Sequence, residues 1–454
     1  MSLFKFESML KTNSIYFFDL VEFEEIIVHY IDAGKQALAK KAVKLGLQQH
    51  PASIDLKLLR VEIYIFENEL DKASMLLKII ERLEPNNDEV FIQKATISSK
   101  NGNHKEAIEL LKKALTFTDD KLDIWSLLGM EYLYLDDFKN ARLVFEKCIL
   151  VDYEDYSALY NLVYCFDMDK EHEEAITYLN SYIEINPYCE VAWHQLGRQY
   201  FILEMYQEAL NSFDYAVLID ESFIGGYLEK AKTLEQLERY KEAIDNYLIT
   251  LKLDDATAFV YLRIGECHEK IENFDEAISF YKKAVHEDPL LDKGWMMLAN
   301  IYHAQNNFQK AAYYISKALT IEEDNSLYWR RYSEINLKLN FYEEAVAGFE
   351  KCLALNDDAL EIYMGLTDVL SFLGEFNDAI HTLIKAQKIY KDSAEVEYRL
   401  TGLFFILNKE KYSFNHLKAA MKIDYDYRII LRELYPVVYD HIKVQKLLSD
   451  FKKD

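Results

Sequence analysis

The 454-residue chain has little proline and little glycine, with 5 and 13 residues respectively. No Gly/Ser-rich, Pro-rich or homopolymeric stretch occurs, so we expect neither hinges nor disordered tethers. No apolar run reaches membrane-spanning length, and charged residues interrupt the amino terminus where a signal peptide would need an apolar core. We therefore expect a cytoplasmic protein that does not bind membranes.

Cysteine and basic residues are scarce as well. The five cysteines, an odd number, indicate a reducing compartment, and no CxxC pair is present to build a zinc ribbon or a thioredoxin-type site. With 52 Lys and Arg against 77 Asp and Glu, the formal net charge is -25. Binding to nucleic acid needs clustered cations for the phosphates, so we expect no nucleic-acid partner.

What the sequence does contain is a period of 34 residues. An alanine recurs at that spacing from Ala39 to Ala379, and the next step reaches Ser413. An uninterrupted period indicates identical supersecondary units, each of which buries its apolar face only against its neighbours. Taking Ala39 as repeat position 20, we predict twelve tandem repeats over residues 20–427, and all repeat positions below use this numbering.

Each repeat is predicted to form two helices. Apolar residues recur at steps of three and four on both sides of a short turn, as in Trp125, Leu128 and Tyr132 before the turn and Ala141 and Phe145 after it. Small residues at repeat positions 8 and 20 let the two helices approach closely. Repeat position 15, in the turn, often holds glycine or asparagine, which accept a left-handed backbone.

The pattern W-x-x-L-G-x-x-Y followed by A-x-x-x-F resembles the tetratricopeptide repeat (TPR), as does the helix-turn-helix period of 34 residues. The run FFDLVEFEEIIVHYIDAGKQALAKKAVKLGLQQHP is also similar to all-repeat cytoplasmic TPR proteins of Bacteroidota. We therefore expect an all-α fold, an α-solenoid whose repeats stack into a right-handed superhelix.

Both ends depart from the repeat pattern. Residues 1–19 are too apolar for a solvated tail, and we expect them to cap the first repeat; the alternative is that they occupy a groove of this or another copy. Residues 428–454 begin like a further repeat, but Pro436 interrupts the first helix. There we expect a degenerate repeat followed by an amphipathic capping helix.

No catalytic pattern is present. The chain lacks a phosphate-binding loop, a GxSxG motif and the metalloprotease HExxH spacing, and its histidines scatter over different repeat positions. We therefore expect no enzyme activity, no catalytic residue, no metal site and no cofactor. The predicted function is that of a protein-interaction scaffold or adaptor, and the alternatives are a helical-repeat nucleic-acid binder and a regulatory subunit of an enzyme complex.

The TPR resemblance implies that first helices line a concave groove, in which repeat positions 2, 5, 6, 9, 12 and 13 touch a bound peptide or helix. In the first four repeats these positions are mostly apolar and predict a groove for an amphipathic partner helix, unless the amino-terminal segment or self-association covers it. The predicted apolar groove consists of Leu58, Leu59, Ile65, Phe66, Leu127, Met130, Leu133 and Tyr134.

From the fifth to the tenth repeat the same positions become polar and partly basic. They predict a surface for a protein or peptide partner with acidic side chains, because arginine pairs bidentately with carboxylates. The alternative is a groove that neutralises itself through Arg-Glu pairs between neighbouring repeats. The predicted partner-binding residues are Tyr160, Asn161, Tyr164, His194, Arg198, Lys232, Arg263, Asn300, Arg330 and Arg331.

Overall fold

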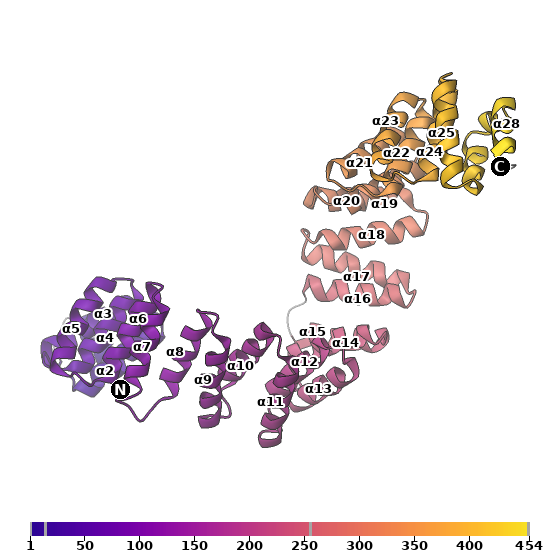
Figure 1. Ribbon diagram of the computed structural model, residues 1–454. Helices are drawn as coiled ribbons and strands as arrows, with labels where there is room; N and C mark the ends of the chain where they lie inside the picture. The colour runs from indigo at the N-terminus through magenta and orange to yellow at the C-terminus, as the bar shows by residue number, and fades with distance from the viewer. Residues whose placement is uncertain (1, 13–15, 254–256, 452–454) are drawn as a thin grey trace. The chain divides into compact units, whose positions relative to one another are not determined.

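The computed structural model describes residues 2–12, 16–253 and 257–451, which form helices and no strand (Figure 1). They divide into an N-terminal part, residues 1–233, and a C-terminal part, residues 234–454. Within each part, each helix packs mainly against the helices next to it in the chain. The predicted all-α, helical-repeat class is therefore confirmed.

From α2 to α25, even-numbered helices are the first helices of the predicted repeats and odd-numbered helices are the second ones. The helices up to the division, which falls within α14, are α1 (Ser2–Thr12), α2 (Leu20–Asp32), α3 (Gln36–Gln49), α4 (Ile54–Phe66), α5 (Leu70–Leu83), α6 (Asp88–Lys100), α7 (His104–Ala114), α8 (Leu122–Leu133), α9 (Phe138–Val151), α10 (Tyr156–Asp169), α11 (His172–Ile185), α12 (Glu190–Ile202), α13 (Tyr206–Ile219) and α14 (Ile224–Gln236).

The C-terminal part continues in the same manner and ends in three short helices. Its helices are α15 (Tyr240–Leu253), α16 (Ala258–Lys270), α17 (Phe274–Glu287), α18 (Asp292–Ala304), α19 (Phe308–Ile321), α20 (Ser326–Lys338), α21 (Tyr342–Ala354), α22 (Leu360–Leu373), α23 (Phe376–Ile389), α24 (Ala394–Ile406), α25 (Glu410–Ile423), the 3-10 turn η1 (Asp426–Arg428), α26 (Ile429–Leu434), α27 (Pro436–Tyr439) and α28 (Ile442–Phe451).

A left-handed residue ends every first helix from α2 to α24. The next N–H then bonds back across the turn, as from Lys35 N to the Tyr30 carbonyl and from Asn273 N to the His268 carbonyl, both at 2.8 Å. The prediction for the glycines and asparagines at repeat position 15 is confirmed, and other residue types adopt the same conformation. The residues with positive φ at this position are Gly34, Asn68, Gly102, Asp136, Lys170, Glu204, Glu238, Glu272, Asn306, Asn340, Gly374 and Asn408.

Polar caps start many of the first helices. Ser53 Oγ accepts the Leu56 N–H at 3.1 Å, and Asp155 Oδ1 accepts the Ala158 N–H at 2.9 Å. Each cap satisfies a backbone donor that has no partner within the first turn. Sequence signals at both ends of these helices therefore set their length, and with it the side chains that each helix presents.

Close packing within several helix pairs depends on a glycine at repeat position 8. A Cβ on Gly129 would lie 2.5 Å from the ring of Phe145, and a Cβ on Gly197 would lie 2.6 Å from the ring of Phe213. The small residue thus makes room for the ring at repeat position 24, in addition to the expected close approach at position 20. Both rings are buried as a result.

The described residues at the amino terminus pack onto the first helix of the first repeat. Phe6, on α1, is buried, and its ring lies 5.8 Å from that of Phe18 and 6.3 Å from that of Phe23 on α2. Residues 1 and 13–15 of the predicted capping segment lie outside the described residues. The boundaries at residues 19, 20 and 427 stay predictions.

At the carboxyl end the ring of Tyr435 occupies the space beside Gly402 on α24. Pro436 stands at the first turn of α27, and Val444 and Leu448 of α28 are buried. Ile442, in the first turn of the predicted amphipathic capping helix, is exposed. Residues 452–454 of the predicted terminal segment lie outside the described residues.

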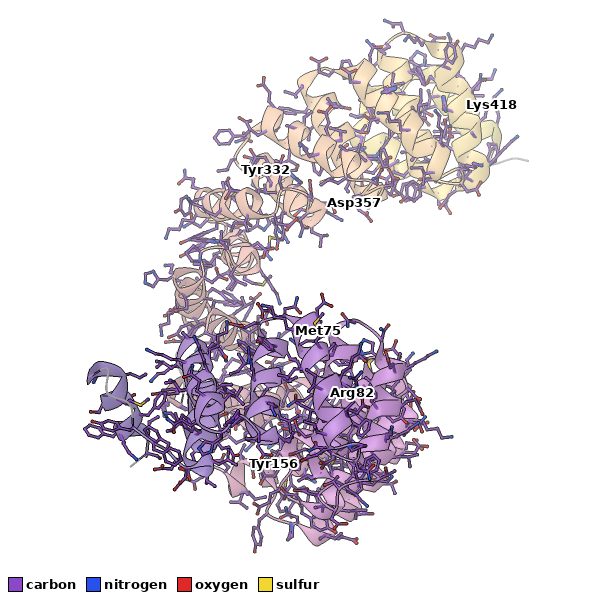
Figure 2. The ribbon with its side chains drawn as sticks, turned by 90° about the vertical axis from the view of Figure 1, so that its left-hand side faces the viewer. Met75, Arg82, Tyr156, Tyr332, Asp357 and Lys418 are labelled. Atoms are coloured by element: carbon purple, nitrogen blue, oxygen red, sulfur yellow. The ribbon has the colours of Figure 1, made fainter. Side chains whose placement is uncertain are left out.

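Some second helices carry exposed apolar side chains. On α5, Met75 and Ile79 lie one turn apart and both are exposed; Figure 2 labels Met75, with Arg82 on the same helix.

No described helix has both the length and the apolarity to cross a membrane.

The left-handed turns give a test of the repeat register. Replacing Glu204 and Glu272 by glycine should raise the free energy of unfolding by about 1 kcal/mol each, because a Cβ disfavours positive φ. The matched pair Glu208→Gly and Glu276→Gly, four residues further along the chain and inside the next helices, should lower it by about 1 kcal/mol each. Urea unfolding followed by circular dichroism measures both pairs, and equal effects of the two pairs would contradict the register.

Candidate functional site

The structure divides the predicted apolar groove between core and surface. Leu58 and Ile65 are buried in the cluster around Leu77, and Leu59 is partly buried. Phe66 is exposed. Leu58 and Ile65 therefore contribute to the core and not to a surface that a partner could reach, because the neighbouring helices already cover them.

The part of the predicted apolar groove on α8 surrounds a cavity of about 220 Å³. Leu127 and Tyr134 are exposed at its rim, with Tyr134 58% exposed, and Met130 lines it. Leu133, the fourth predicted residue of α8, is partly buried. The full lining is Ala95, Thr96, Ser99, Leu111, Leu127, Met130, Glu131 and Tyr134.

A polar pair supports this cavity from one side. Glu131 is buried, and its Oε2 lies 2.9 Å from Nδ1 of His104. The imidazole ring in turn lies against the ring of Tyr134, with centroids 4.9 Å apart. The pair thus holds Tyr134 at the rim of the cavity, which reduces the conformational entropy that the ring would lose on binding.

The adjacent first helix, α10, extends the surface. The amide of Asn161 lies 3.9 Å from the sulfur of Met130, so α8 and α10 are in contact here. Tyr160 and Tyr164 are both exposed, 40% and 48% respectively. The predicted apolar and polar residues therefore adjoin one another. We call the set Leu127, Met130, Tyr134, Tyr160 and Tyr164 the aromatic surface.

On α12, by contrast, two polar side chains are buried. His194 packs between the rings of Phe213 and Phe223, at centroid distances of 5.7 and 5.1 Å. Burial lowers the pKa of His194 to about 4, so the imidazole is neutral at pH 7. Its Nδ1 and the Nε2 of Gln195, a residue only 1% exposed, have no hydrogen-bond partner among the described residues. His194, predicted to bind a partner, is thus mostly covered.

Arg198, on the same helix, is exposed and only weakly paired. Its side chain is 42% exposed, its Nη1 donates to Oε1 of Gln195 at 3.2 Å, and its closest carboxylate contact, to Asp167, is 4.0 Å long. Lys232 on α14, by comparison, lies 2.8 Å from Glu229. Arg198 is the predicted arginine with the highest exposed fraction and the longest ion pair.

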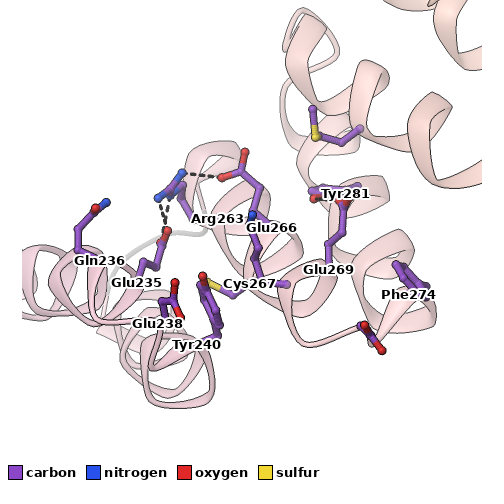
Figure 3. Close-up of a pocket in the computed structure, with 13 residues that line it drawn as sticks. Glu235, Gln236, Glu238, Tyr240, Arg263, Glu266, Cys267, Glu269, Phe274 and Tyr281 are labelled. Atoms are coloured by element: carbon purple, nitrogen blue, oxygen red, sulfur yellow. Dashed lines mark hydrogen bonds and ion pairs between the residues drawn. The ribbon is translucent and has the colours of Figure 1, made fainter. Parts of the chain in front are cut away.

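In the C-terminal part, Arg263 is held between two carboxylates. Its Nη1 lies 2.6 Å from Glu266 on the same helix, and it donates to Glu235 on α14 through Nε and Nη2 (Figure 3). Burial acts to lower the pKa of Arg263, but its hydrogen bonds and the charges of Glu235 and Glu266 have the larger combined effect. The pKa of Arg263 is therefore raised above its ordinary value. At Arg263 the structure thus has the alternative given in the sequence analysis, an Arg-Glu pair between neighbouring repeats.

The remaining predicted cations share one acid. Arg330 and Arg331 contact Glu334 at 3.4 and 2.7 Å, all three on α20. Asn300, on α18, differs, because its Oδ1 is buried and has no hydrogen-bond partner among the described residues. Each predicted arginine of this part therefore contacts at least one glutamate, while one predicted amide has an unsatisfied acceptor.

A cavity of about 840 Å³ surrounds Arg263 (Figure 3). The sequence did not predict this cavity, because the residues predicted to bind a partner were the basic and polar ones at the groove positions. Most of the charged residues that line the cavity are acidic, with five glutamates against one arginine and one lysine. The lining is Glu235, Gln236, Glu238, Tyr240, Arg263, Glu266, Cys267, Glu269, Lys270, Glu272, Phe274, Tyr281 and Met297. A signal was present in the sequence, since Glu235 and Glu269 stand at repeat position 12 of adjacent repeats.

The cysteines and the candidate metal ligands do not form a site for nucleophilic or metal chemistry among the described residues. All five cysteines are buried and free, and burial raises the pKa of Cys267 to about 12, which suppresses its thiolate. Within residues 2–12, 16–253 and 257–451, no three His, Cys, Asp or Glu side chains are arranged to hold a metal ion.

Comparison with known proteins identifies the repeats. Models of the tetratricopeptide repeat match residues 88–120, 126–188, 228–291 and 292–325, so the resemblance predicted from the sequence is confirmed. Anaphase-promoting complex subunit 3 of Schizosaccharomyces pombe is 25% identical over 29% of this chain and 20% of that protein. The DnaJ homolog subfamily C member 7 homolog of the same yeast is 25% identical over 39% of this chain and 34% of that protein.

A further relative, DnaJ homolog subfamily C member 3 of Homo sapiens, is 25% identical over 40% of this chain and 39% of that protein. The chain thus spans between 20% and 39% of the length of these three curated relatives.

Solved structures of helical-repeat proteins are also similar. The C-terminal part of a TPR repeat-containing protein from Cytophaga hutchinsonii has a TM-score of 0.46 and 16% identity, covering 51% of this chain and 95% of that one. The APC/C hetero-tetramer Cut9-Hcn1 has a TM-score of 0.36 and 14% identity, covering 95% of this chain and 90% of that one.

The burial of His194 predicts a pH dependence of stability. A histidine whose pKa is lowered from 6.5 to about 4 by folding stabilises the fold fully above pH 6.5, and this contribution is lost as the pH falls to 4. Between those values the wild type should lose on the order of 3 kcal/mol relative to His194→Phe. Urea unfolding of both proteins from pH 7 to pH 4 measures the difference. A difference that does not change with pH would show that the imidazole is not buried in its neutral form.

Proposed function

Because this chain carries tetratricopeptide repeats, we propose that it is a protein-interaction scaffold that binds a segment of a partner protein on the first helices of its N-terminal part. The observation that carries the proposal is the aromatic surface. Leu127 and Tyr134 are exposed at a cavity, and Tyr160 and Tyr164 are exposed on the adjoining first helix α10.

Aromatic side chains at such a place are suited to binding. Tyrosine offers a large apolar ring with a polar tip, has few rotatable bonds, and is over-represented among the residues that dominate interface energies. Tyr134 and Tyr164 also rest on other rings, those of His104 and Phe138, at 4.9 and 6.4 Å. The surface is therefore partly ordered before a partner arrives, which lowers the entropic cost of binding.

The proposed ligand is an amphipathic segment with an apolar side chain for the cavity and a carboxylate for Arg198. The acidic component is smaller than the sequence predicted, because Arg263, Arg330 and Arg331 already contact glutamates. Arg198 remains the group best placed to pair with an acidic side chain of the partner.

A paired substitution tests this function. Tyr134→Ala with Tyr164→Ala should remove specific partners from the proteins that co-purify with the chain from cells of its source. The control, Leu143→Ala with Leu150→Ala, also removes exposed apolar side chains, but from the second helix α9, and should leave the partners in place. Quantitative mass spectrometry compares the two sets.

A photo-crosslinking residue at position 134 supplies the direct measurement. It should form a covalent adduct with a protein that the Tyr134→Ala and Tyr164→Ala variant loses, and Arg198→Gln should weaken that complex about tenfold. If both double variants retain the same proteins as the wild type, and residue 134 forms no adduct, the aromatic surface is not a binding site.

A further inference from the structure

Two successive repeats of the C-terminal part use a buried tyrosine to hold a glutamate. The Tyr247 hydroxyl donates to Oε1 of Glu235 at 2.5 Å, and the Tyr281 hydroxyl donates to Oε2 of Glu269 at 2.8 Å. Tyrosine at repeat position 24 and glutamate at position 12 occur together in these two predicted repeats and in no other. Because a buried phenol requires an acceptor, each tyrosine fixes the carboxylate that it contacts.

Only one of the two carboxylates has a cation. Glu235 receives the guanidinium of Arg263, which stands at position 6 of the following repeat (Figure 3). The same position one repeat later is occupied by Met297, which lines the cavity together with Glu269. Across the described part of the chain, no ion pair is formed by Glu269.

The second acceptor of the guanidinium also has an equivalent. Arg263 contacts Glu266, at repeat position 9, and Asn300 is the residue at that position one repeat later. Asn300 Oδ1 is buried and has no hydrogen-bond partner among the described residues. Asn300 is not among the residues that line the cavity, so Glu269 is the equivalent acceptor that an incoming group can reach there.

The cavity has the charge and the shape for such a group. Glu238 and Glu272, from two inter-helix turns, add negative charge at its edge, and Lys293 is already engaged with Glu266 at 2.6 Å. Met297 replaces the arginine with an unbranched apolar chain, against which the methylene groups of an incoming arginine can pack.

We propose that this cavity binds an arginine side chain of a partner segment, with the guanidinium on Glu269 as the guanidinium of Arg263 lies on Glu235. The bidentate fit between guanidinium and carboxylate distinguishes arginine from other cations. The ligand is opposite in charge to the carboxylate proposed for Arg198, so this site is independent of the aromatic surface and of the function proposed for it.

Binding of a defined probe tests the proposal. The probe is a fluorescein-labelled hexapeptide of alternating glycine and arginine, and its counterpart has citrulline in place of arginine, which keeps the shape and removes the charge. By fluorescence anisotropy, the full chain should bind the arginine peptide at least about tenfold more tightly. Glu269→Gln should remove most of that difference while leaving an oxygen to accept the Tyr281 hydroxyl.

Control variants distinguish binding at this cavity from a general attraction of the basic probe to an acidic chain. Glu276→Gln, on the exposed side of α17, removes the same charge and should change the affinity less than about twofold. Met297→Arg supplies the missing guanidinium from within the chain and should block the probe without lowering the melting temperature. Gln309→Arg adds the same charge on the exposed surface of α19 and should not block it.

Equal losses for Glu269→Gln and Glu276→Gln, equal binding of the citrulline peptide, or full binding by Met297→Arg would each overturn the proposal. The Tyr134→Ala and Tyr164→Ala variant should bind the probe like the wild type, so a failure of the aromatic surface and a failure of this cavity give different results.

Discussion

Several helix pairs depend on one steric contact, between a glycine at repeat position 8 of the first helix and the ring at position 24 of the following helix. At Gly197 the ring of Phe213 fills the space that a Cβ would need. The two helices can then approach closely, and their buried faces are fixed. Because the buried face is fixed, the residues presented on the other face of each first helix are fixed as well. The candidate sites are consequences of this packing.

The presented face carries two different chemistries in one chain. It exposes Tyr134 at a cavity after α8 and two further tyrosines on α10, and from α14 to α18 it carries glutamates around a single paired arginine. The difference comes from a few repeat positions. Position 12, for example, holds Leu133 in one case and Glu269 in the other. A repeated backbone thus allows different stretches of one chain to present different chemistries at equivalent positions.

Much of this fold could be predicted from the sequence, because the contacts that hold it are local and recur. The spacing of Ala39 and its equivalents predicted the helix pairs, and glycine or asparagine at position 15 predicted the left-handed turns. The state of individual groove residues could not be predicted, because it depends on neighbours outside the helix that carries each residue. Arg263, for example, is neutralised by Glu235 from the repeat before it, and His194 is covered by Phe223, the last residue of its own repeat, which follows the second helix.

The left-handed turns have a mechanical consequence. Glycine and asparagine occupy them towards both ends of the repeat series, whereas five consecutive turns in its middle hold Asp136, Lys170, Glu204, Glu238 and Glu272. The lysine and the three glutamates strain their turns, and in a repeat protein such strain acts mainly on the helix pair that contains it. The middle pairs should therefore open more readily and exchange their amide hydrogens sooner. Since the aromatic surface and the acidic cavity lie among these pairs, the chain is most compliant where a partner would have to fit.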